Sequence, residues 1–343
     1  NKSNKFIFFY PGNIKQKTGG YIYENNIFEY SKKNNNLIHF NELSDNYPFP
    51  SNKDLKYLNS IVANLNSDKI LIFDGLVLEG LVKAEYIFNN FKTIALIHHP
   101  LYLEFRGKKS DNFLNIAKKI YKKVDYFIVT SSDTKKLLSK KFKINSNIIS
   151  IVEPGIERFK KYKKSPSKLV KLLTCGSIIY RKKYDYLINE IQKIDNIELN
   201  IIGDTSRETQ YSVKIKKQIT DNKLNKKIIL HGKVSKIKLE KLYSQCDFYI
   251  STSKYEGFGM SLANAALSRL PIISYKTSTI KKTIGKSGVL YFNNFKKGTL
   301  QKLILNNCFN REIYKKLKNS IGKKKYLTNI QSAKLFIEVI KNA

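Results

Sequence analysis

The sequence predicts an α/β protein built from two doubly wound, Rossmann-like domains. Short apolar stretches alternate with longer segments of helical spacing along the whole chain. The alternation stops once, at Glu153-Pro154-Gly155 and the polar stretch 160–168, and then restarts. Repeated strand–helix alternation is typical of a parallel sheet with helices on both faces. A length of 343 residues suits two such domains.

The first half of the chain contains six apolar stretches that we expect to form buried strands. Their ranges are 5–10, 37–40, 69–74, 93–98, 126–130 and 148–152. Apolar residues recur at helical spacing in three segments between them: 54–64, 113–124 and 132–142. We therefore expect an N-terminal domain over residues 1–158, which ends just after the turn signal.

The second half repeats the pattern. We expect strands at 171–175, 198–202, 227–231, 248–251, 271–274 and 288–291. The expected helices are 183–194, 207–222, 236–245, 258–269 and 296–305. This predicts a second domain over 159–308, followed by C-terminal helices over 309–343, the last of them packed back towards the N-terminal domain. Ligands of such paired domains bind in a cleft between the carboxyl ends of both sheets.

The composition narrows the kind of partner and the compartment. The net charge is +36, but only six of the 63 basic residues are Arg, the side chain best suited to bidentate phosphate and base contacts. The lysines are scattered, which favours a solvated surface and argues against nucleic acid. No apolar run is long enough to span a bilayer or to form a signal-peptide core. We expect a cytoplasmic protein, and a peripheral position on the inner face of the cell membrane stays open.

The most informative segment runs from Tyr255 to Asn264, after an expected strand and at the start of an expected helix. Gly257 and Gly259 let the backbone approach a ligand, and a helix start offers N–H groups to an anion. Glu256 and Asn264 are eight positions apart, about two helical turns, so both could face one ligand. The pattern fits a bound phosphate with polar groups on sugar hydroxyls. A plain glycine-rich turn explains it about equally well.

This segment resembles the E-G-F/Y-G-x-x-x-x-E element of the retaining glycosyltransferases of family 4, which have the GT-B architecture. Six further pieces resemble family elements and follow in the family's order. They are Thr18-Gly19-Gly20, His98-His99-Pro100-Leu101 with Glu104, Glu153-Pro154-Gly155-Ile156, Cys175-Gly176-Ser177 with Arg181-Lys182, Ile201-Ile202-Gly203-Asp204, and His231-Gly232-Lys233-Val234. The resemblance covers most of the chain and implies two Rossmann-like domains that face each other across a cleft.

The resemblance also implies roles for single residues. Glu256 would bond hydroxyls of the donor sugar, and Lys182 with Arg181 would neutralise the departing diphosphate. His98, at a strand end, would contact the sugar or the reaction centre. The other residues implied in donor binding are Gly19, Gly20, Gly176, Gly203, Asp204, Gly232, Val234, Gly257, Phe258, Gly259, Met260 and Asn264. The structural alternatives are a solvated helix start for Arg181 and Lys182, a strand-capping histidine for His98, and a plain first-helix turn for the loop expected at Gly19-Gly20.

Two positions depart from the family pattern. Asn264 stands where the family has a second Glu. Its amide can still donate and accept hydrogen bonds, but without the added strength that a charged carboxylate gives. Ser177 stands where many relatives carry Arg, so phosphate neutralisation would depend on Arg181 and Lys182. The candidate acceptor-binding residues, all in the first domain, are Asp74, His99, Glu104, Arg106 and Lys108. The lysine-flanked apolar face of 113–124 fits either an anionic membrane surface or an ordinary packed helix.

The chain has no Asp-x-Asp and no His, Cys or Asp residues at metal-ligand spacing, so we expect no metal and no cofactor besides a UDP- or GDP-sugar donor. The function implied is a retaining, metal-independent hexosyltransferase. It would move a sugar from a nucleotide donor to a glycan or lipid-linked acceptor in the synthesis of cell-surface polysaccharide, such as lipopolysaccharide, or glycolipid. The alternatives are a catalytically weak or silent GT-B protein that binds sugar nucleotide or glycan, and a GT-B sugar-nucleotide epimerase.

Overall fold

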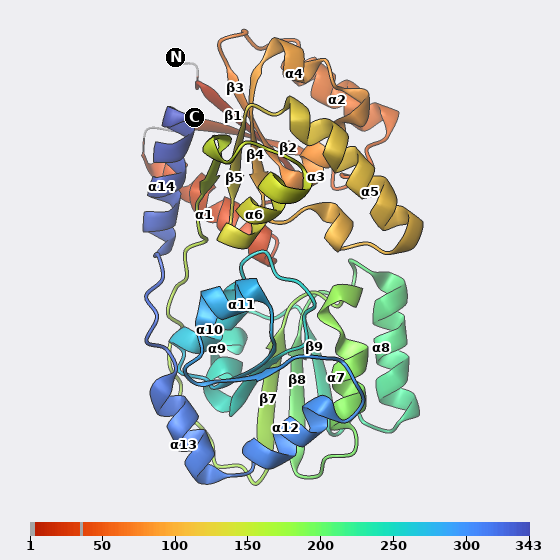
Figure 1. The fold of residues 1–343 in the computed structure, drawn as a ribbon, viewed down its shortest axis with the longest axis vertical. Helices are drawn as coiled ribbons and strands as arrows, with labels where there is room; N and C mark the ends of the chain where they lie inside the picture. Colours follow the sequence, from red (N-terminus) through yellow and green to blue (C-terminus); the bar gives the residue numbers. More distant parts are fainter. Residues whose placement is uncertain (1–3, 35–36) are drawn as a thin grey trace. The chain divides into compact units, whose positions relative to one another are not determined.

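The computed structural model describes residues 4–34 and 37–343, which form two compact α/β units (Figure 1). The first unit runs to Gly155 and includes Leu327–Ala343, and the second is Ile156–Tyr326. The chain thus leaves the first unit slightly before residue 158, and its last helix belongs to the first unit. Each unit has a parallel six-stranded sheet with helices packed on it, so the predicted fold class is confirmed.

The sheet of the first unit has the order β2-β1-β3-β4-β5-β6, and all of its pairs are parallel. Almost every residue of its inner strands is apolar, as expected for strands that are covered on both faces. Its strands are β1 (Phe6–Pro11), β2 (Ile38–Leu43), β3 (Ile70–Asp74), β4 (Lys92–Ile97), β5 (Tyr126–Val129) and β6 (Ile149–Ile151).

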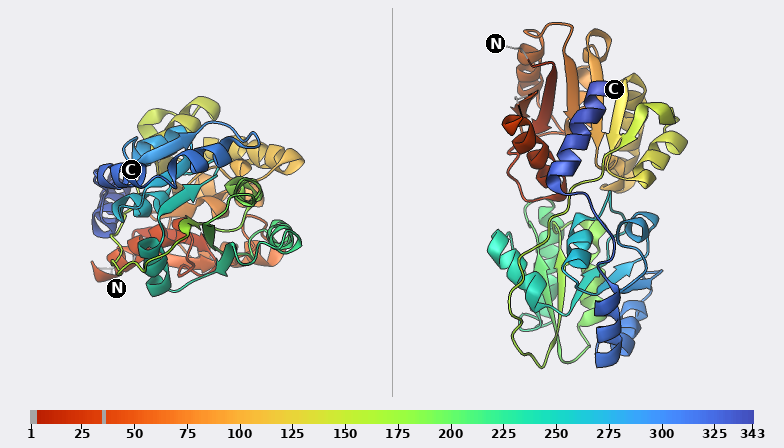
Figure 2. Two further views of the ribbon diagram at one scale, coloured as in Figure 1. Left: turned by 90° about the horizontal axis from the view of Figure 1, so that it is seen from below. Right: turned by 90° about the vertical axis from the view of Figure 1, so that its left-hand side faces the viewer.

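Two apolar cores lie on opposite faces of this sheet. Alternate residues of β1, such as Phe8 and Phe9, point into different cores. One core includes α1 (Gly19–Lys33) and α14 (Asn329–Asn342), which pack on each other (Figure 2). The other lies under α2 (Asn52–Val62), α3 (Gly75–Glu79), α4 (Ile87–Asn90), α5 (Gly107–Ile120) and α6 (Ser132–Lys141).

The sheet of the second unit has the order β12-β11-β10-β7-β8-β9, again with parallel pairs. Its strands are β7 (Val170–Cys175), β8 (Ile197–Ile202), β9 (Ile228–Gly232), β10 (Phe248–Ser251), β11 (Ile272–Tyr275) and β12 (Val289–Phe292). Its helices are α7 (Tyr184–Ile191), α8 (Thr209–Asp221), α9 (Lys236–Gln245), α10 (Met260–Leu267), α11 (Ser278–Ile284), α12 (Thr299–Asn307) and α13 (Arg311–Ser320).

Three local features differ from the sequence predictions. Gly19 and Gly20 form the first turn of α1 instead of a loop. Helix α5 begins at Gly107, six residues before the expected start at 113. The short α3 and α11 were not expected, because five and seven residues are too few for a clear helical period. No helix among the described residues is long and apolar enough to cross a bilayer.

Candidate active site

The second unit holds Glu256 between two cations. Lys182 Nζ lies 2.5 Å from Glu256 Oε1, and Arg181 Nη1 lies 3.4 Å from Oε2. The side chains of Arg181, Lys182 and Glu256 are only 14%, 12% and 9% exposed. The two basic residues follow β7 and Glu256 follows β10, and these strands are neighbours in the sheet. Because parallel strands end at the same edge, residues far apart in sequence meet there. Burial of both cations excludes the solvated helix start.

Backbone contacts hold this cluster in place. Arg181 and Lys182 lie in the short 3-10 turn Tyr180–Lys182. The Lys254 N–H donates to the carbonyl of Arg181 at 2.9 Å, and the Thr252 hydroxyl donates to that of Lys182 at 2.7 Å. The Arg181 guanidinium also donates to the Tyr255 carbonyl at 2.7 Å. The turn after β7 is therefore fixed to the loop after β10.

The charges of the cluster decide the protonation state of Glu256. Burial alone would raise the pKa of Glu256, but Lys182 and Arg181 beside it lower this pKa to about 2. Burial also lowers the pKa of Lys182, and the attraction of Glu256 opposes that change. Glu256 is therefore a carboxylate at neutral pH and a very weak base.

Glycines occupy the ends of three neighbouring strands. The Gly176 N–H donates to Ile202 O at 2.9 Å, and the Gly203 N–H donates to Gly232 O at 3.0 Å. A Cβ on Gly176 would lie 2.9 Å from Lys182 Cε, and a Cβ on Gly203 would lie 1.9 Å from Gly176 O. Side chains at Gly176 and Gly203 are thus excluded, and the edge beside Lys182 consists of bare backbone.

Asp204 and Val234, two of the residues predicted to bind the sugar donor, contact other residues of the same unit. Asp204, directly after Gly203, forms an ion pair with Lys233 at 2.9 Å and accepts bonds from Ser206. Burial would raise the pKa of Asp204, but the Lys233 ammonium and the Ser206 bonds hold it below its usual value. Val234, further along the same edge, is partly buried against the core of this unit.

The start of α10 partly changes the interpretation of the 255–264 segment. Gly259 has φ +96, a conformation that favours glycine, and the helix begins only at Met260. Glu256 therefore precedes the helix, and the expected two-turn spacing to Asn264 is wrong. Gly257 and Phe258 are buried, and the Phe258 carbonyl accepts a bond from Thr283 at 2.6 Å. The side chain of Asn264, half-buried on α10, has no hydrogen-bond partner within the described part of the chain.

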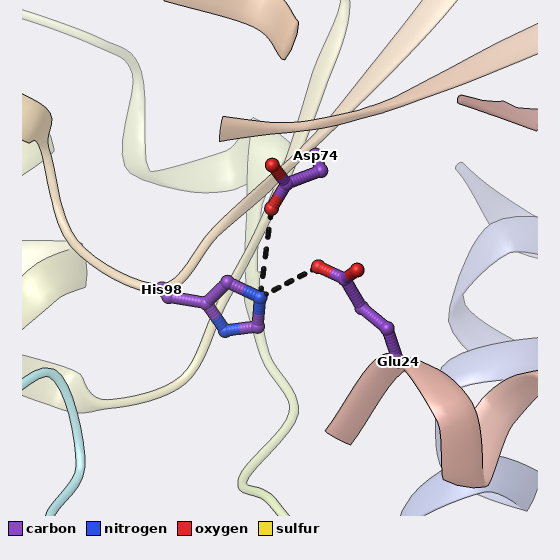
Figure 3. A group of neighbouring side chains, drawn as sticks. All are labelled: Glu24, Asp74 and His98. Atoms are coloured by element: carbon purple, nitrogen blue, oxygen red, sulfur yellow. Dashed lines mark hydrogen bonds and ion pairs between the residues drawn. The ribbon is translucent and has the colours of Figure 1, made fainter. Parts of the chain in front are cut away.

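The first unit holds a second polar cluster, at the carboxyl ends of β3 and β4. His98 Nε2 lies 2.8 Å from Glu24 Oε1 and 3.7 Å from Asp74 Oδ2 (Figure 3). Gly20 lies against the same ring, because a Cβ there would be 3.2 Å from His98 Cδ2. Gly20 and Glu24 are four positions apart on α1, so they share one helix face. The structure thus brings Gly20, His98 and Asp74 together and adds Glu24.

Sequence reasoning missed Glu24. The signal that could have found it is its position one helical turn after Gly20, but this signal exists only if the Gly-Gly pair is recognised as helical.

Burial raises the pKa of Glu24 to about 7 and that of Asp74 well above its usual range, and it lowers the pKa of His98. The nearest N and O atoms of the three residues lie within 4.8 Å of one another, a spacing at which a metal ion could be held. Spacing along the sequence gave no sign of this.

The other residues predicted to bind the acceptor substrate form no contact with His98 Nε2 among those that the structure describes. His99 Nε2 is paired with Glu104 Oε1 at 2.8 Å. Asp74 also caps α3, because its Oδ1 accepts from the Leu76 N–H at 2.8 Å. Arg106 and Lys108 are exposed at the start of α5. The neighbouring Lys109 ammonium lies 4.4 Å and 4.3 Å from the ring centres of Phe49 and Phe105.

The fold of the two units is that of the GT-B glycosyltransferases. HepE of Anabaena, solved in complex with UDP and glucose, has the same fold, with a TM-score of 0.75, 14% identity and coverage of 99% of this chain and 100% of that one. Residues 155–324 match the family described as glycosyl transferases group 1. By this match, which takes up nearly all of it, the second unit belongs to the group 1 glycosyl transferases.

Curated relatives agree with this assignment. The GtfA subunit of the UDP-N-acetylglucosamine–peptide N-acetylglucosaminyltransferase of Streptococcus agalactiae is 30% identical over 44% of this chain and 30% of its own length. An uncharacterized glycosyltransferase of Methanocaldococcus jannaschii is 26% identical over 86% of this chain and 82% of that protein. An uncharacterized 41.2 kDa protein in the cps region of Klebsiella pneumoniae is 26% identical over 69% and 67%. The chain spans about a third of the length of the GtfA subunits that it matches.

Proposed function

We propose that the protein is a retaining glycosyltransferase that moves a sugar from a nucleotide-diphosphate donor to a glycan or lipid-linked acceptor. The observation that supports this best is the buried Glu256 between Lys182 and Arg181, at a strand edge made of bare glycine backbone. The relative in a cps region favours a role in cell-surface polysaccharide or glycolipid synthesis.

The donor is proposed to be a UDP- or GDP-sugar. The streptococcal relatives are named for a UDP-sugar, and HepE was solved with UDP. Lys182 and Arg181 both pair with Glu256, whose single carboxylate offsets only one of their two positive charges. A bound diphosphate would compete for these cations, since phosphate oxygens are strong acceptors of charged N–H donors. The Glu256 carboxylate would then be released to accept bonds from sugar hydroxyls.

The chemistry is proposed as a front-face displacement. The bond between the anomeric carbon and the diphosphate oxygen breaks, and the acceptor oxygen bonds to the same face of that carbon. The acceptor's proton passes to the departing phosphate oxygen. Glu256, with a pKa of about 2, is a poor base for this proton. Lys182 and Arg181 stabilise the charge that develops on the leaving group. We propose that no metal is required for this step.

The acceptor is proposed to bind through the first unit. Arg106, Lys108 and Lys109 are exposed at the start of α5 and suit an anionic acceptor group or an anionic membrane surface. Lys109 lies over two phenylalanine rings, one of which, Phe49, is exposed. A mixed basic and aromatic surface of this kind is typical of peripheral membrane contacts. We therefore propose a peripheral position at the membrane.

A panel of UDP-, GDP- and ADP-sugars tests the proposal, with release of nucleoside diphosphate measured for the wild type and for Glu256→Ala. We expect hydrolysis of one donor and a loss of about 10²–10³-fold in Glu256→Ala. Glu312→Ala, an exposed change on α13, is the control and should behave as the wild type. Binding without turnover would instead support the silent binder, and an altered sugar on an intact nucleotide would support the epimerase. No response to any donor would overturn all three.

A further inference from the structure

The Glu24 carboxyl contacts the His98 ring and has no part in the chemistry proposed above. Glu24 is 2% exposed, and its Oε1 atom lies at hydrogen-bond distance, 2.8 Å, from His98 Nε2. Asp74 Oδ2 is 3.7 Å from the same nitrogen, too far for a hydrogen bond. Asp74 Oδ1 already accepts from the Leu76 N–H. Among the described side chains, Glu24 is thus the only direct hydrogen-bond partner of His98 Nε2.

The rest of the ring is held by packing. Gly20 lies against the Cδ2–Nε2 edge, and the ring of Tyr23 meets His98 edge-on, with 5.7 Å between ring centres. The His98 carbonyl accepts a bond from the Thr130 hydroxyl at 3.1 Å. Figure 3 shows Nδ1 on the side of the ring that faces away from both carboxylates. Nδ1 has no hydrogen-bond partner among residues 4–34 and 37–343.

The bond to Glu24 decides which ring nitrogen carries the proton. A neutral imidazole donates through one nitrogen and accepts through the other, and a partner at one nitrogen selects the tautomer. Burial favours the neutral ring, because it lowers the pKa of His98. A carboxyl oxygen that lies at hydrogen-bond distance from an imidazole nitrogen ordinarily accepts its N–H, which makes Glu24 Oε1 the acceptor at 2.8 Å. His98 Nε2 then carries the hydrogen and Nδ1 carries the lone pair.

We propose that Glu24 is a positioning residue that fixes His98 in the Nε2–H tautomer, so that Nδ1 accepts a hydrogen bond from a sugar hydroxyl. This inference rests on the proposed glycosyltransferase function for the identity of the hydroxyl, but the tautomer itself does not depend on it. Loss of Glu24 frees the ring to mix tautomers and to turn, because Asp74 cannot reach Nε2 without moving. Gln at position 24 keeps an oxygen that can accept from Nε2–H.

The tautomer can be measured directly by long-range ¹H–¹⁵N NMR correlations on histidine-labelled protein. The chain has only four histidines, and the His98→Gln spectrum identifies the signal of His98. We expect a protonated Nε2 and a bare Nδ1 in the wild type and in Glu24→Gln, and mixed tautomers in Glu24→Ala. Glu29→Ala, on the exposed side of the same helix, is the matched control and should leave the His98 signal unchanged. A protonated Nδ1 in the wild type, or an unchanged tautomer in Glu24→Ala, would overturn the proposal.

Kinetics supply the second readout, with the donor that the panel identifies. We expect Glu24→Ala to lower kcat at least tenfold with little change in the KM for the donor, and Glu24→Gln to recover most of that loss. An equal loss in both variants would argue for a merely structural Glu24. If no donor is turned over, the proposed function fails, and the NMR result still decides the tautomer.

Discussion

Glu256 shows what a single buried charge requires. Taking a carboxylate out of water costs several kcal/mol, and the cost is offset only by close, well-oriented cations. Lys182 and Arg181 provide them at 2.5 Å and 3.4 Å. The same two cations are of the kind that a diphosphate group needs, and pairing with Glu256 holds them in place.

The first prediction concerns the pH dependence of stability. The pKa of Glu256 is about 2 in the folded protein and about 4.5 in an unfolded chain, so its pairing stabilises the fold above pH 4.5. That contribution is lost as the pH falls from about 4.5 to about 2. Glu256→Gln should therefore lower the free energy of unfolding at pH 7 by roughly 3 kcal/mol. The difference from the wild type, measured by urea unfolding, should shrink below pH 4.5. A difference that does not vary with pH would refute the assigned ion pairs.

A second prediction at this scale concerns Asn264. Its half-buried side chain has no hydrogen-bond partner within the described part of the chain. We expect Asn264→Glu to bind the nucleotide more tightly, by about tenfold, because a carboxylate accepts stronger hydrogen bonds from ribose hydroxyls than an amide does. Isothermal titration with the nucleotide measures the change. Unchanged or weaker binding would remove Asn264 from the donor site.

Residue positions were predictable where a motif repeats family spacing, and not where partners meet through the fold. The spacing of Lys182 from Gly176 pointed to both residues, and a Cβ on Gly176 would indeed touch that lysine. Glu24 is 74 positions from His98, and no short-range pattern connects them. Their meeting depends on how α1 packs against the residue that follows β4. Whether these residues act in catalysis stays a prediction.

At the scale of elements, α1 carries the clearest constraint. It begins at the Gly-Gly pair, and Gly20 is small because the His98 ring lies against it. A Cβ at 3.2 Å is tighter than an ordinary contact, so the ring would have to shift by a few tenths of an ångström. Gly20 therefore leaves room for the His98 ring and contributes less than another residue would to the stability of the helix.

The corresponding prediction separates activity from stability. Gly20→Ala should leave the free energy of unfolding unchanged or raise it by up to about 1 kcal/mol, because Ala is the better helix former. Its activity should nevertheless fall at least tenfold, since the ring of His98 is displaced. Gly75→Ala, also at a helix start but with its nearest contact at 3.5 Å, is the control. Full activity of Gly20→Ala would show that the position of His98 is not critical.

Most elements could be predicted because their period is clear. The strands are short and almost wholly apolar, and α9 was expected at its observed bounds, Lys236–Gln245. The first turn of α1 was expected to be a loop because Gly19 and Gly20 are poor helix formers, and tertiary packing on α14 overrides that preference. The spacing of Glu256 and Asn264 was misjudged because the left-handed Gly259 separates the loop from α10.

At the scale of the whole molecule, the first unit is built from two separate segments of the chain, and the second unit from the segment between them. Alternation of strands and helices predicted two sheets, and the unit boundary follows the one interruption of that alternation. The order of strands within each sheet could not be read from the sequence, because it depends on crossover connections. The second unit ends at Tyr326, and α14 returns to the core of the first.

The return of α14 gives a prediction for stability. Phe336 is fully buried and packs against Phe8 and Tyr23 of the first unit. We expect Phe336→Ala to lower the free energy of unfolding of that unit by about 3–5 kcal/mol. Ile330→Ala, on the same helix but at a side chain that is 67% exposed, should change it by less than about 0.5 kcal/mol. Urea unfolding followed by tyrosine fluorescence compares the two, and equal effects would contradict the packing of α14.

The central claim is that Lys182 and its neighbours bind the diphosphate of a nucleotide sugar. Equilibrium titration of UDP, GDP and ADP against the wild type, Lys182→Met and the exposed control Lys214→Met tests it most directly. We predict that one nucleotide binds the wild type and Lys214→Met equally, and that Lys182→Met weakens its binding at least tenfold. Equal binding by all three proteins, or binding of no nucleotide at all, would contradict the claim.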